Sequence, residues 1–483
     1  MKLKRIISVI LCLCIIAGLT GVAASGESRQ LDPDTAVVMI PGLSMNTVAV
    51  YDGDGNKLLD SKLEYDLSGI GSCIPGLAVS LLMTSIFNMD IGLSANTAGT
   101  VGKLLPGFNK NNSAVPARMD KPLSEYSTSD YRAFSQYVNL SGMGDMLTQT
   151  YLYNYDDFGS IREAADGLND YINDVVLSKG YRSIVLCPVS LGGCVAAEYL
   201  DLYPESHAYI KKVVFMVAAT CGADSIGELM TKDLTIIESP EKAIDTIISL
   251  LDEYGADVNT NLVRILLKLL INRRSFDTIV DSVIFGINDS VAGTALWALC
   301  PDAYYAEARA NFLMRKRDDA KRAEIDRFMQ ARANLQQNLK DIEAGGGRIY
   351  VLSGYGRQLD LFCDPAWFGS AEFVSSDSIV TAAATSFGAT VADYGETLPE
   401  DYTPASPVCT DPSHDHISPD RRVDASTCMY PETTWFFYMV SHAGFGSNYK
   451  TLALIKLLIS DNAPEDVYSD PAFPQFMNPY NYP

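Results

Sequence analysis

Strand-like and helix-like segments alternate along the chain between residues 150 and 220. Three short runs rich in β-branched and aromatic residues are separated by two amphipathic patterns, and Ser160 with Glu163 forms a capping box before the first of these. Successive β, α and β elements of this kind build parallel sheets covered by helices on both faces. The order predicts an α/β fold with a mostly parallel central sheet. The predicted strands are TYLYNYD (150–156), RSIVLC (182–187) and KKVVFMVAAT (211–220).

Further apolar runs at 36–42, 348–356 and 433–442 have the same strand-like character, whereas residues 223–345 carry mostly helical patterns. A long helical segment between two parts of a strand-rich core is typical of an insertion. The predicted division is a signal peptide (1–24), a core (31–222 and 346–465), a helical cap or lid insertion (223–345) and a C-terminal tail (466–483).

Composition excludes some classes of function. The 483 residues are 47% hydrophobic and 20% charged, which indicates a globular protein. The formal net charge of -22 argues against a nucleic-acid partner and against adsorption to an anionic membrane by bulk charge.

The first residues combine a basic start, an apolar stretch and a small-residue exit, VAA, at Ala24. This pattern predicts a cleaved signal peptide and an exported protein, the alternative being an uncleaved anchor. An exported protein can form disulfide bonds. We expect one between Cys409 and Cys428, because the loop between them is dense in Pro, Asp and Ser and has little apolar content to hold it.

The stretch SIVLCPVSLGGCVAAEYL, residues 183–200, reads as strand, sharp turn and helix. That geometry is typical of a nucleophile elbow, in which the turn exposes a serine hydroxyl beside a helix N-terminus. Ser190 is therefore the candidate nucleophile. Gly192 matches the second glycine of the elbow pattern, whereas Pro188 stands where the first glycine is expected. The alternative is an ordinary strand-to-helix turn.

A serine nucleophile needs a base, and the chain has four histidines. His442 is preferred because it follows the last strand of the core, where the base faces the same sheet edge as the serine. His416 and His414 are the runners-up. Their alternative is a solvated loop or a weak metal site with nearby aspartates, namely Asp411, Asp415 and Asp420.

The acid should follow the strand at 348–356, and Asp377 satisfies the order serine, acid, histidine. Asp360 is the runner-up. Two backbone N–H groups should bind the oxyanion. Leu191 supplies one from the elbow, and Leu43 supplies the other from the turn IPGLSMN, with Ser44 close behind.

These segments together resemble the α/β-hydrolase superfamily of the lipase/esterase type, and are similar to the lecithin:cholesterol acyltransferase-like lipases. The resemblance rests on VVMIPGLS, YLYNYDD, CPVSLGGCVAAEYL, SSDSIVTAAATS and VSHAGF, and covers residues 36–221 and 348–460. It implies an α/β-hydrolase fold, a helical cap or lid over the site, and no cofactor. A second flap is expected from the apolar segment 70–93, whose alternative is a buried helix.

We therefore expect a serine hydrolase that cleaves lipid-like carboxylic esters through Ser190, His442 and Asp377, with no metal in the reaction. The expected partners are a small-molecule or lipid ester and a transient lipid surface, with no nucleic acid and no obligate protein partner. The alternatives on the same fold are a thioesterase, an amidase, a peptidase or an acyltransferase. An inactive hydrolase fold used for binding is the alternative outside the enzymes.

Overall fold

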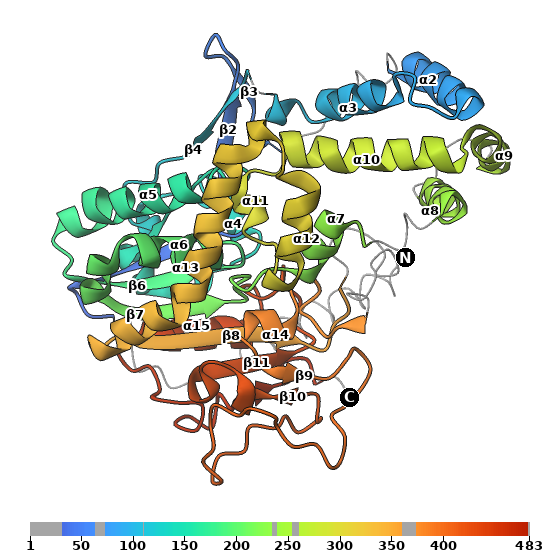
Figure 1. The fold of residues 1–483 in the computed structure, drawn as a ribbon. Coiled ribbons are helices and arrows are strands. Elements are labelled where there is room, and N and C mark those ends of the chain that lie inside the picture. The colour runs from blue at the N-terminus through green and yellow to red at the C-terminus, as the bar shows by residue number, and fades with distance from the viewer. Residues whose placement is uncertain are drawn as a thin grey trace, which may run out of the picture.

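The centre of the molecule is a parallel sheet of seven strands (Figure 1). The computed structural model describes residues 31–62, 73–109, 111–233, 239–253, 260–359 and 373–481. The strand order is β12-β11-β8-β7-β6-β1-β5, and every neighbouring pair is parallel. The strands are β1 (Thr35–Ile40), β5 (Thr150–Leu152), β6 (Ser183–Pro188), β7 (Ile210–Met216), β8 (Arg348–Tyr355), β11 (Thr434–Tyr438) and β12 (Phe476–Met477).

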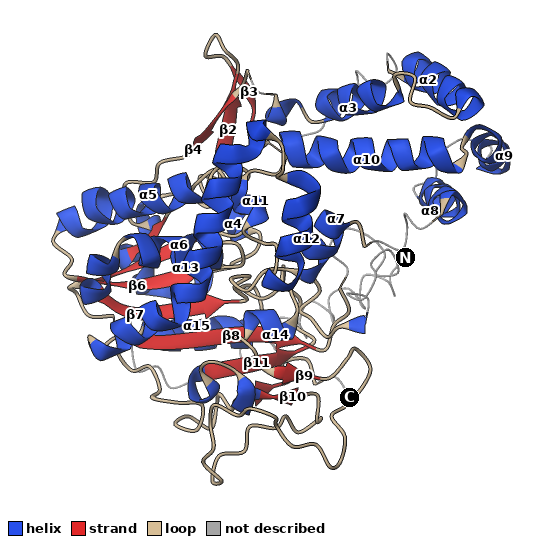
Figure 2. Cartoon of the chain, in the orientation of Figure 1, coloured by secondary structure: helices blue, strands red, loops and turns tan. Residues whose placement is uncertain are grey.

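Alternate residues of the strands feed two separate cores, one on each face of the sheet. Ala36 and Val38 of β1 pack with residues of α5 (Ile161–Tyr171), α6 (Gly192–Leu202) and α13 (Asp319–Ala344). On the other face, Val37 and Met39 pack with residues of α15 (Tyr449–Ile459). Helices on both faces of a parallel sheet, in this strand order, make this an α/β-hydrolase fold (Figure 2).

The local signals in the sequence correspond to real element ends. Ser160 caps α5, since its Oγ accepts a hydrogen bond from the Glu163 N–H at 2.9 Å. A small antiparallel sheet beside the main one consists of β2 (Val48–Tyr51), β3 (Lys57–Leu59) and β4 (Ser113–Pro116). Two-stranded pairing of β9 (Thr390–Val391) with β10 (Val423–Asp424) joins the long loop after β8 to the segment before β11.

The helical insertion divides into two parts. Its last helix, α13, packs on α6 and β8, and it buries Ile325, Phe328, Leu335, Leu339 and Ile342 in the cluster on this face of the sheet. Helix α13 thus packs on the core, and the bounds 223–345 of a cap or lid insertion stay a prediction. The preceding helices are α7 (Asp224–Thr231), α8 (Pro240–Glu253), α9 (Thr260–Leu270), α10 (Arg273–Ser290), α11 (Thr294–Trp297) and α12 (Asp302–Phe312).

Helices from two distant parts of the chain form an extension that projects from the core (Figure 1). Helices α2 (Ile74–Phe87) and α3 (Leu93–Leu104) contact α10, and α2 also contacts α9, which in turn contacts α8. We call α2, α3 and α8–α10 the helical extension. None of the helices in the described residues has both the length and the apolar character that crossing a bilayer requires.

Two sequence expectations differ from the structure. The predicted tail 466–483 contributes β12, which pairs with β11 at the sheet edge. Cys409 and Cys428 are both free thiols rather than a disulfide. The Cys428 sulfur is buried near Thr434 Oγ1, at 3.7 Å, while the Cys409 sulfur faces His414. The predicted signal peptide 1–24 lies outside the described residues.

Candidate active site

Ser190 occupies a strained turn between β6 and α6. Its backbone has a φ of 52°, in the left-handed region that non-glycine residues rarely adopt. The turn is held on both sides, because the Ser190 N–H donates to the Met216 carbonyl at 3.2 Å and the Ser190 carbonyl accepts from Ala219 at 2.9 Å. This is the local geometry of a nucleophile elbow.

The geometry of this turn requires glycine at position 192 and is compatible with proline at position 188. A Cβ on Gly192 would lie 2.3 Å from the Ile40 carbonyl oxygen of the neighbouring strand, so no larger residue fits. Pro188 is the last residue of β6 and is paired with Ile40 of β1. The turn therefore forms with proline two residues before Ser190.

Asp377 and His442 meet in a buried, hydrogen-bonded pair. His442 Nδ1 lies 2.7 Å from Asp377 Oδ2, and the His442 N–H donates to the Asp377 carbonyl at 2.6 Å. The other carboxylate oxygen accepts from the N–H groups of Ile379 and Val380, at 3.0 and 2.8 Å. Asp377 is fully buried. These bonds fix the carboxylate, and an ionised Asp377 would hold the proton of a neutral His442 on Nδ1, leaving Nε2 free to accept one.

The three residues follow the carboxyl ends of β6, β8 and β11, which are near neighbours in the sheet. They therefore share one edge. Within the described part of the chain, Ser190 Oγ and His442 Nε2 form no hydrogen bond, so the bond that would join serine to base is not made in this structure. Hydrogen bonds of this kind are often long in sites without substrate and shorten when substrate binds.

The turn after β1 lies directly against the serine. A Cβ on Gly42 would lie 2.6 Å from Ser190 Cβ and 3.1 Å from its Oγ. The next residue is Leu43, and neither its N–H nor that of Leu191 donates a hydrogen bond to any described residue. Two unused N–H groups flanking a serine can bind an oxyanion.

A buried carboxyl group that the sequence analysis did not single out fastens this turn. Asp157 Oδ2 accepts a hydrogen bond from the Ser44 N–H at 2.6 Å, and Ser44 has a φ of 63°. Asn46 closes the turn on the other side, because its side chain donates to the Gly42 carbonyl at 3.1 Å. Burial raises the pKa of Asp157 to about 7, and the Ser44 N–H opposes that shift. The available signal was the pair of adjacent aspartates, Asp156 and Asp157, where the predicted 150–156 strand ends.

The runner-up histidines, His414 and His416, lie near the amino end of β11, whereas His442 follows its carboxyl end. His416 Nδ1 lies 2.9 Å from Gln475 Oε1, and the Gln475 amide donates to the carbonyl of Thr434, where β11 begins. His442 follows the opposite end of that five-residue strand, about 13 Å away at 3.3 Å per residue. His414 lies beside His416, with ring centroids 5.8 Å apart. Asp360 lies outside the described residues.

Comparison with known proteins does not assign the chain to a family. No protein-family model matches the chain, and no curated protein matches it. Among solved structures it is similar to the Tle4–Tli4 complex, with 14% identity and a TM-score of 0.27 over 67% of this chain and 75% of that one.

The chain is also similar to the phospholipase PlaB from Legionella pneumophila, again at 14% identity and with a TM-score of 0.24. The match covers 51% of this chain and 38% of PlaB in its complex with thio-NAD, and 56% and 43% in the other PlaB structure. The chain thus matches less than half the length of PlaB.

Proposed function

We propose that this protein is an exported serine hydrolase that cleaves carboxylic esters with a lipid-like acyl group. The observation that carries the proposal is the Asp377–His442 pair, with its 2.7 Å hydrogen bond, at the same sheet edge as the left-handed Ser190. A nucleophile, a base and an acid on one edge, in this chain order, are the parts that acyl transfer needs.

In the proposed reaction, Ser190 Oγ attacks the ester carbonyl while His442 Nε2 takes the hydroxyl proton. The N–H groups of Leu43 and Leu191 bind the negative oxygen of the tetrahedral intermediate. Asp377 stabilises the imidazolium that forms. As the intermediate collapses, the ester C–O bond breaks and His442 returns the proton to the leaving alcohol.

The acyl group is then bound to Ser190 as an ester. Water attacks this ester while His442 accepts one of its protons, and the second collapse returns that proton to Ser190 Oγ and releases the carboxylic acid. No cofactor takes part in either step.

The helical extension supports a lipid-like substrate. Helix α2 has no charged residue and exposes Val79, Ile86 and Phe87, with 63%, 62% and 57% of each residue accessible. Helix α9, which contacts α2, exposes Leu262 and Ile265. The exposed Val79, Ile86 and Phe87 are inconsistent with the alternative that α2 is a buried helix. Neighbouring exposed apolar side chains are typical of a surface that meets lipid or another apolar partner.

The test uses purified mature protein and a panel of p-nitrophenyl esters of increasing chain length, beside matched thioesters and anilides. We expect ester hydrolysis that disappears in Ser190→Ala and persists in Ser447→Ala, an exposed serine near the same edge. Activity that favours thioesters or anilides would replace the ester proposal with a thioesterase or an amidase. A well-folded protein inactive on the whole panel, with and without detergent, would contradict the proposal.

Export is tested separately by the intact mass of the protein recovered from the medium or the cell surface. We expect a chain that begins at Ser25. A chain that retains residues 1–24 would support the anchor alternative.

A further inference from the structure

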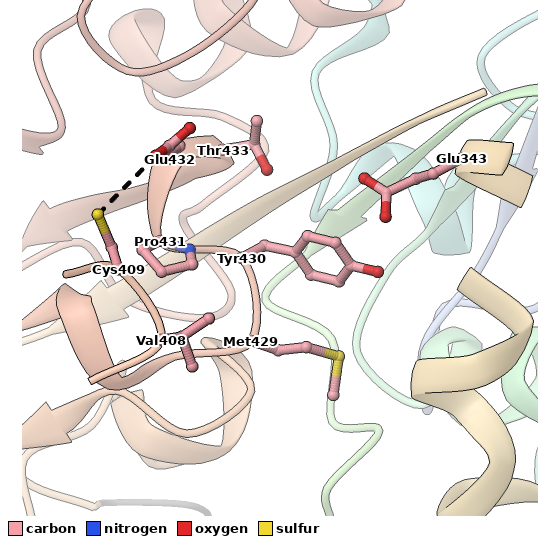
Figure 3. A pocket seen from close by; sticks show the side chains of 8 residues that line it. All are labelled: Glu343, Val408, Cys409, Met429, Tyr430, Pro431, Glu432 and Thr433. Carbon is pink, nitrogen blue, oxygen red and sulfur yellow. Dashed lines mark hydrogen bonds between the residues drawn. The ribbon is translucent and has the colours of Figure 1, made fainter. Parts of the chain in front are cut away.

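A cluster of side chains that could bind a metal lies near the amino end of β11, at the opposite end of this strand from His442. Cys409, His414 and His416 each offer a ligand atom, and these atoms lie within 4.8 Å of one another. Glu432, in the segment that leads into β11, is a fourth group that contacts Cys409 and His414, although only the first three residues lie within 4.8 Å of one another. Figure 3 shows Cys409 and Glu432 facing each other across the side of a cavity. No part of this cluster is used in the proposed hydrolysis.

The spacing of three of these atoms matches the edges of a tetrahedral site. Cys409 Sγ lies 3.6 Å from His414 Nδ1, and His414 Nδ1 lies 3.3 Å from Glu432 Oε1. The remaining edge, from the sulfur to Glu432 Oε1, is 3.8 Å. Zinc bonds of about 2.3 Å to sulfur and about 2.0 Å to nitrogen or oxygen place tetrahedral ligands about 3.3–3.5 Å apart. One ion could therefore contact all three atoms after small side-chain movements.

His416 supplies a second, independent observation. It is 4% exposed, and its Nε2 is buried without a hydrogen-bond partner among the described residues. The Gln475 amide nitrogen donates to the carbonyls of Pro431 and Thr434, so Gln475 Oε1 faces His416 Nδ1 as an acceptor. The proton of a neutral His416 is thus on Nδ1. In this tautomer the lone pair on Nε2 is free to bind a metal ion.

The donor set selects the kind of ion. A thiolate and two imidazoles favour zinc over magnesium or calcium, which prefer oxygen ligands. The negative charges of the Cys409 thiolate and the Glu432 carboxylate would balance a divalent ion. Four protein ligands leave no open coordination position, as in structural rather than catalytic zinc sites.

We propose that Cys409, His414, His416 and Glu432 form a structural zinc site that fastens the loop at residues 409–416 to the segment that leads into β11. Gln475 acts as a positioning residue, because it orients His416 and immediately precedes β12. Zinc takes the place of the disulfide that the sequence suggested for Cys409. A cavity of about 230 Å³ adjoins the site and is lined in part by Cys409, Tyr430 and Glu432.

The first experiment measures zinc in the purified mature protein. After treatment with a chelator and reloading with Zn²⁺ alone, the wild type should retain about one equivalent through gel filtration and unfold at a higher temperature than the stripped form. His416→Ala should retain none. Asp401→Asn is the control, because Asp401 is an exposed acid of the segment before β11 and is not part of the cluster. It should bind zinc as the wild type does.

The second experiment replaces zinc with Co²⁺ and records its absorption. A thiolate-to-cobalt charge-transfer band should appear in the wild type, remain in Cys428→Ser and vanish in Cys409→Ser. Gln475→Leu should bind zinc about 10–100-fold more weakly, as expected for loss of a group that orients a ligand. Far-UV circular dichroism of each variant checks that it folds.

Three results would overturn the proposal. One is a folded wild type that retains no zinc after reloading. Another is a charge-transfer band that survives Cys409→Ser. The third is a Cys409–Cys428 disulfide in the purified protein, found by thiol counting and peptide mapping. None of these bears on Ser190, so the zinc site and the hydrolase proposal fail or stand separately.

Discussion

The carboxyl ends of the strands and the helical extension differ in how far their key side chains are buried. At the edge, Asp377 is fully buried, and its two carboxylate oxygens accept three hydrogen bonds, from His442 and two backbone N–H groups. In the extension, α2 presents large apolar side chains to solvent. Burial and hydrogen bonding fix a geometry, as bond-making chemistry requires. Exposed apolar surface carries no such geometry, but it can gain free energy by contact with an apolar partner.

This contrast assigns different roles to the two regions. We expect substitutions at the edge to abolish hydrolysis of every ester, because they remove the reacting groups. Substitutions in the extension should affect only substrates presented in a lipid surface.

The largest effect should come from removing His442, compared with removing His416. His442→Ala should lower kcat/KM for a soluble ester by about 10⁶-fold, because it removes the general base. His416→Ala should leave the rate almost unchanged, since His416 lies near the opposite end of β11. Initial rates with a soluble short-chain ester measure both. Equal losses in the two variants would contradict the assignment of the base.

Asp377→Asn should lower kcat by about 10⁴-fold, because an amide cannot stabilise the imidazolium and can favour the wrong His442 tautomer. The fold should survive, since the asparagine oxygen can still accept the N–H groups of Ile379 and Val380. Asp393→Asn, at an exposed acid, is the control. Wild-type kcat in Asp377→Asn, with an unaltered pH profile, would remove Asp377 from the site.

Asp157 should make the protein less stable as the pH rises from about 4 to about 7. The native state holds the Asp157 proton up to a pKa of about 7, whereas the unfolded chain releases it near the ordinary aspartate pKa of 3.8. Over that interval the native state binds more protons, so the free energy of unfolding falls with rising pH.

Asp157→Asn should remove this fall. The free energy of unfolding of the variant minus that of the wild type should therefore be higher at pH 8 than at pH 4, by up to about 4 kcal/mol. Urea unfolding of both proteins across this pH range measures the effect. A difference between them that stays constant with pH would mean that Asp157 titrates normally.

The smallest effect should come from the extension. Replacing Ile86 and Phe87 together by glutamate should lower hydrolysis of an ester embedded in vesicles about tenfold, the loss expected from partial burial of two apolar side chains. Hydrolysis of a soluble short-chain ester should not change. Leu58→Glu, at an exposed apolar residue of β3, is the control. Equal losses on both substrates would show that the extension acts in hydrolysis itself and contradict the separation of the two regions.

The sequence predicts the sheet and the elbow because their signals are local. Each strand is a short apolar run and each helix has a cap or a periodic face, and right-handed crossovers then bring the strand ends to one edge. Pro188 is the only departure from the elbow pattern, and the turn forms with it. Asp377 and His442 could be selected because chain order alone places them after neighbouring strands.

The remaining features depend on contacts between distant segments. Strand β12 has two residues, too few to show a period. The membership of α13 in the core follows from a narrow apolar stripe on a highly charged helix. The partner of Ser44 is Asp157, more than a hundred residues away, and no local pattern connects them. Cys409 lies beside His414, His416 and Glu432 instead of Cys428, an outcome that only the folded loop determines.

The most direct test of the central claim is to locate the residue that a fluorophosphonate probe modifies. Purified mature protein is labelled, digested and mapped by mass spectrometry, beside Ser190→Ala and His442→Ala. We predict one adduct, on Ser190, that is absent from Ser190→Ala and strongly reduced in His442→Ala. An adduct on another serine, or none on a folded wild type with detergent present, would contradict the assignment of Ser190 as the nucleophile.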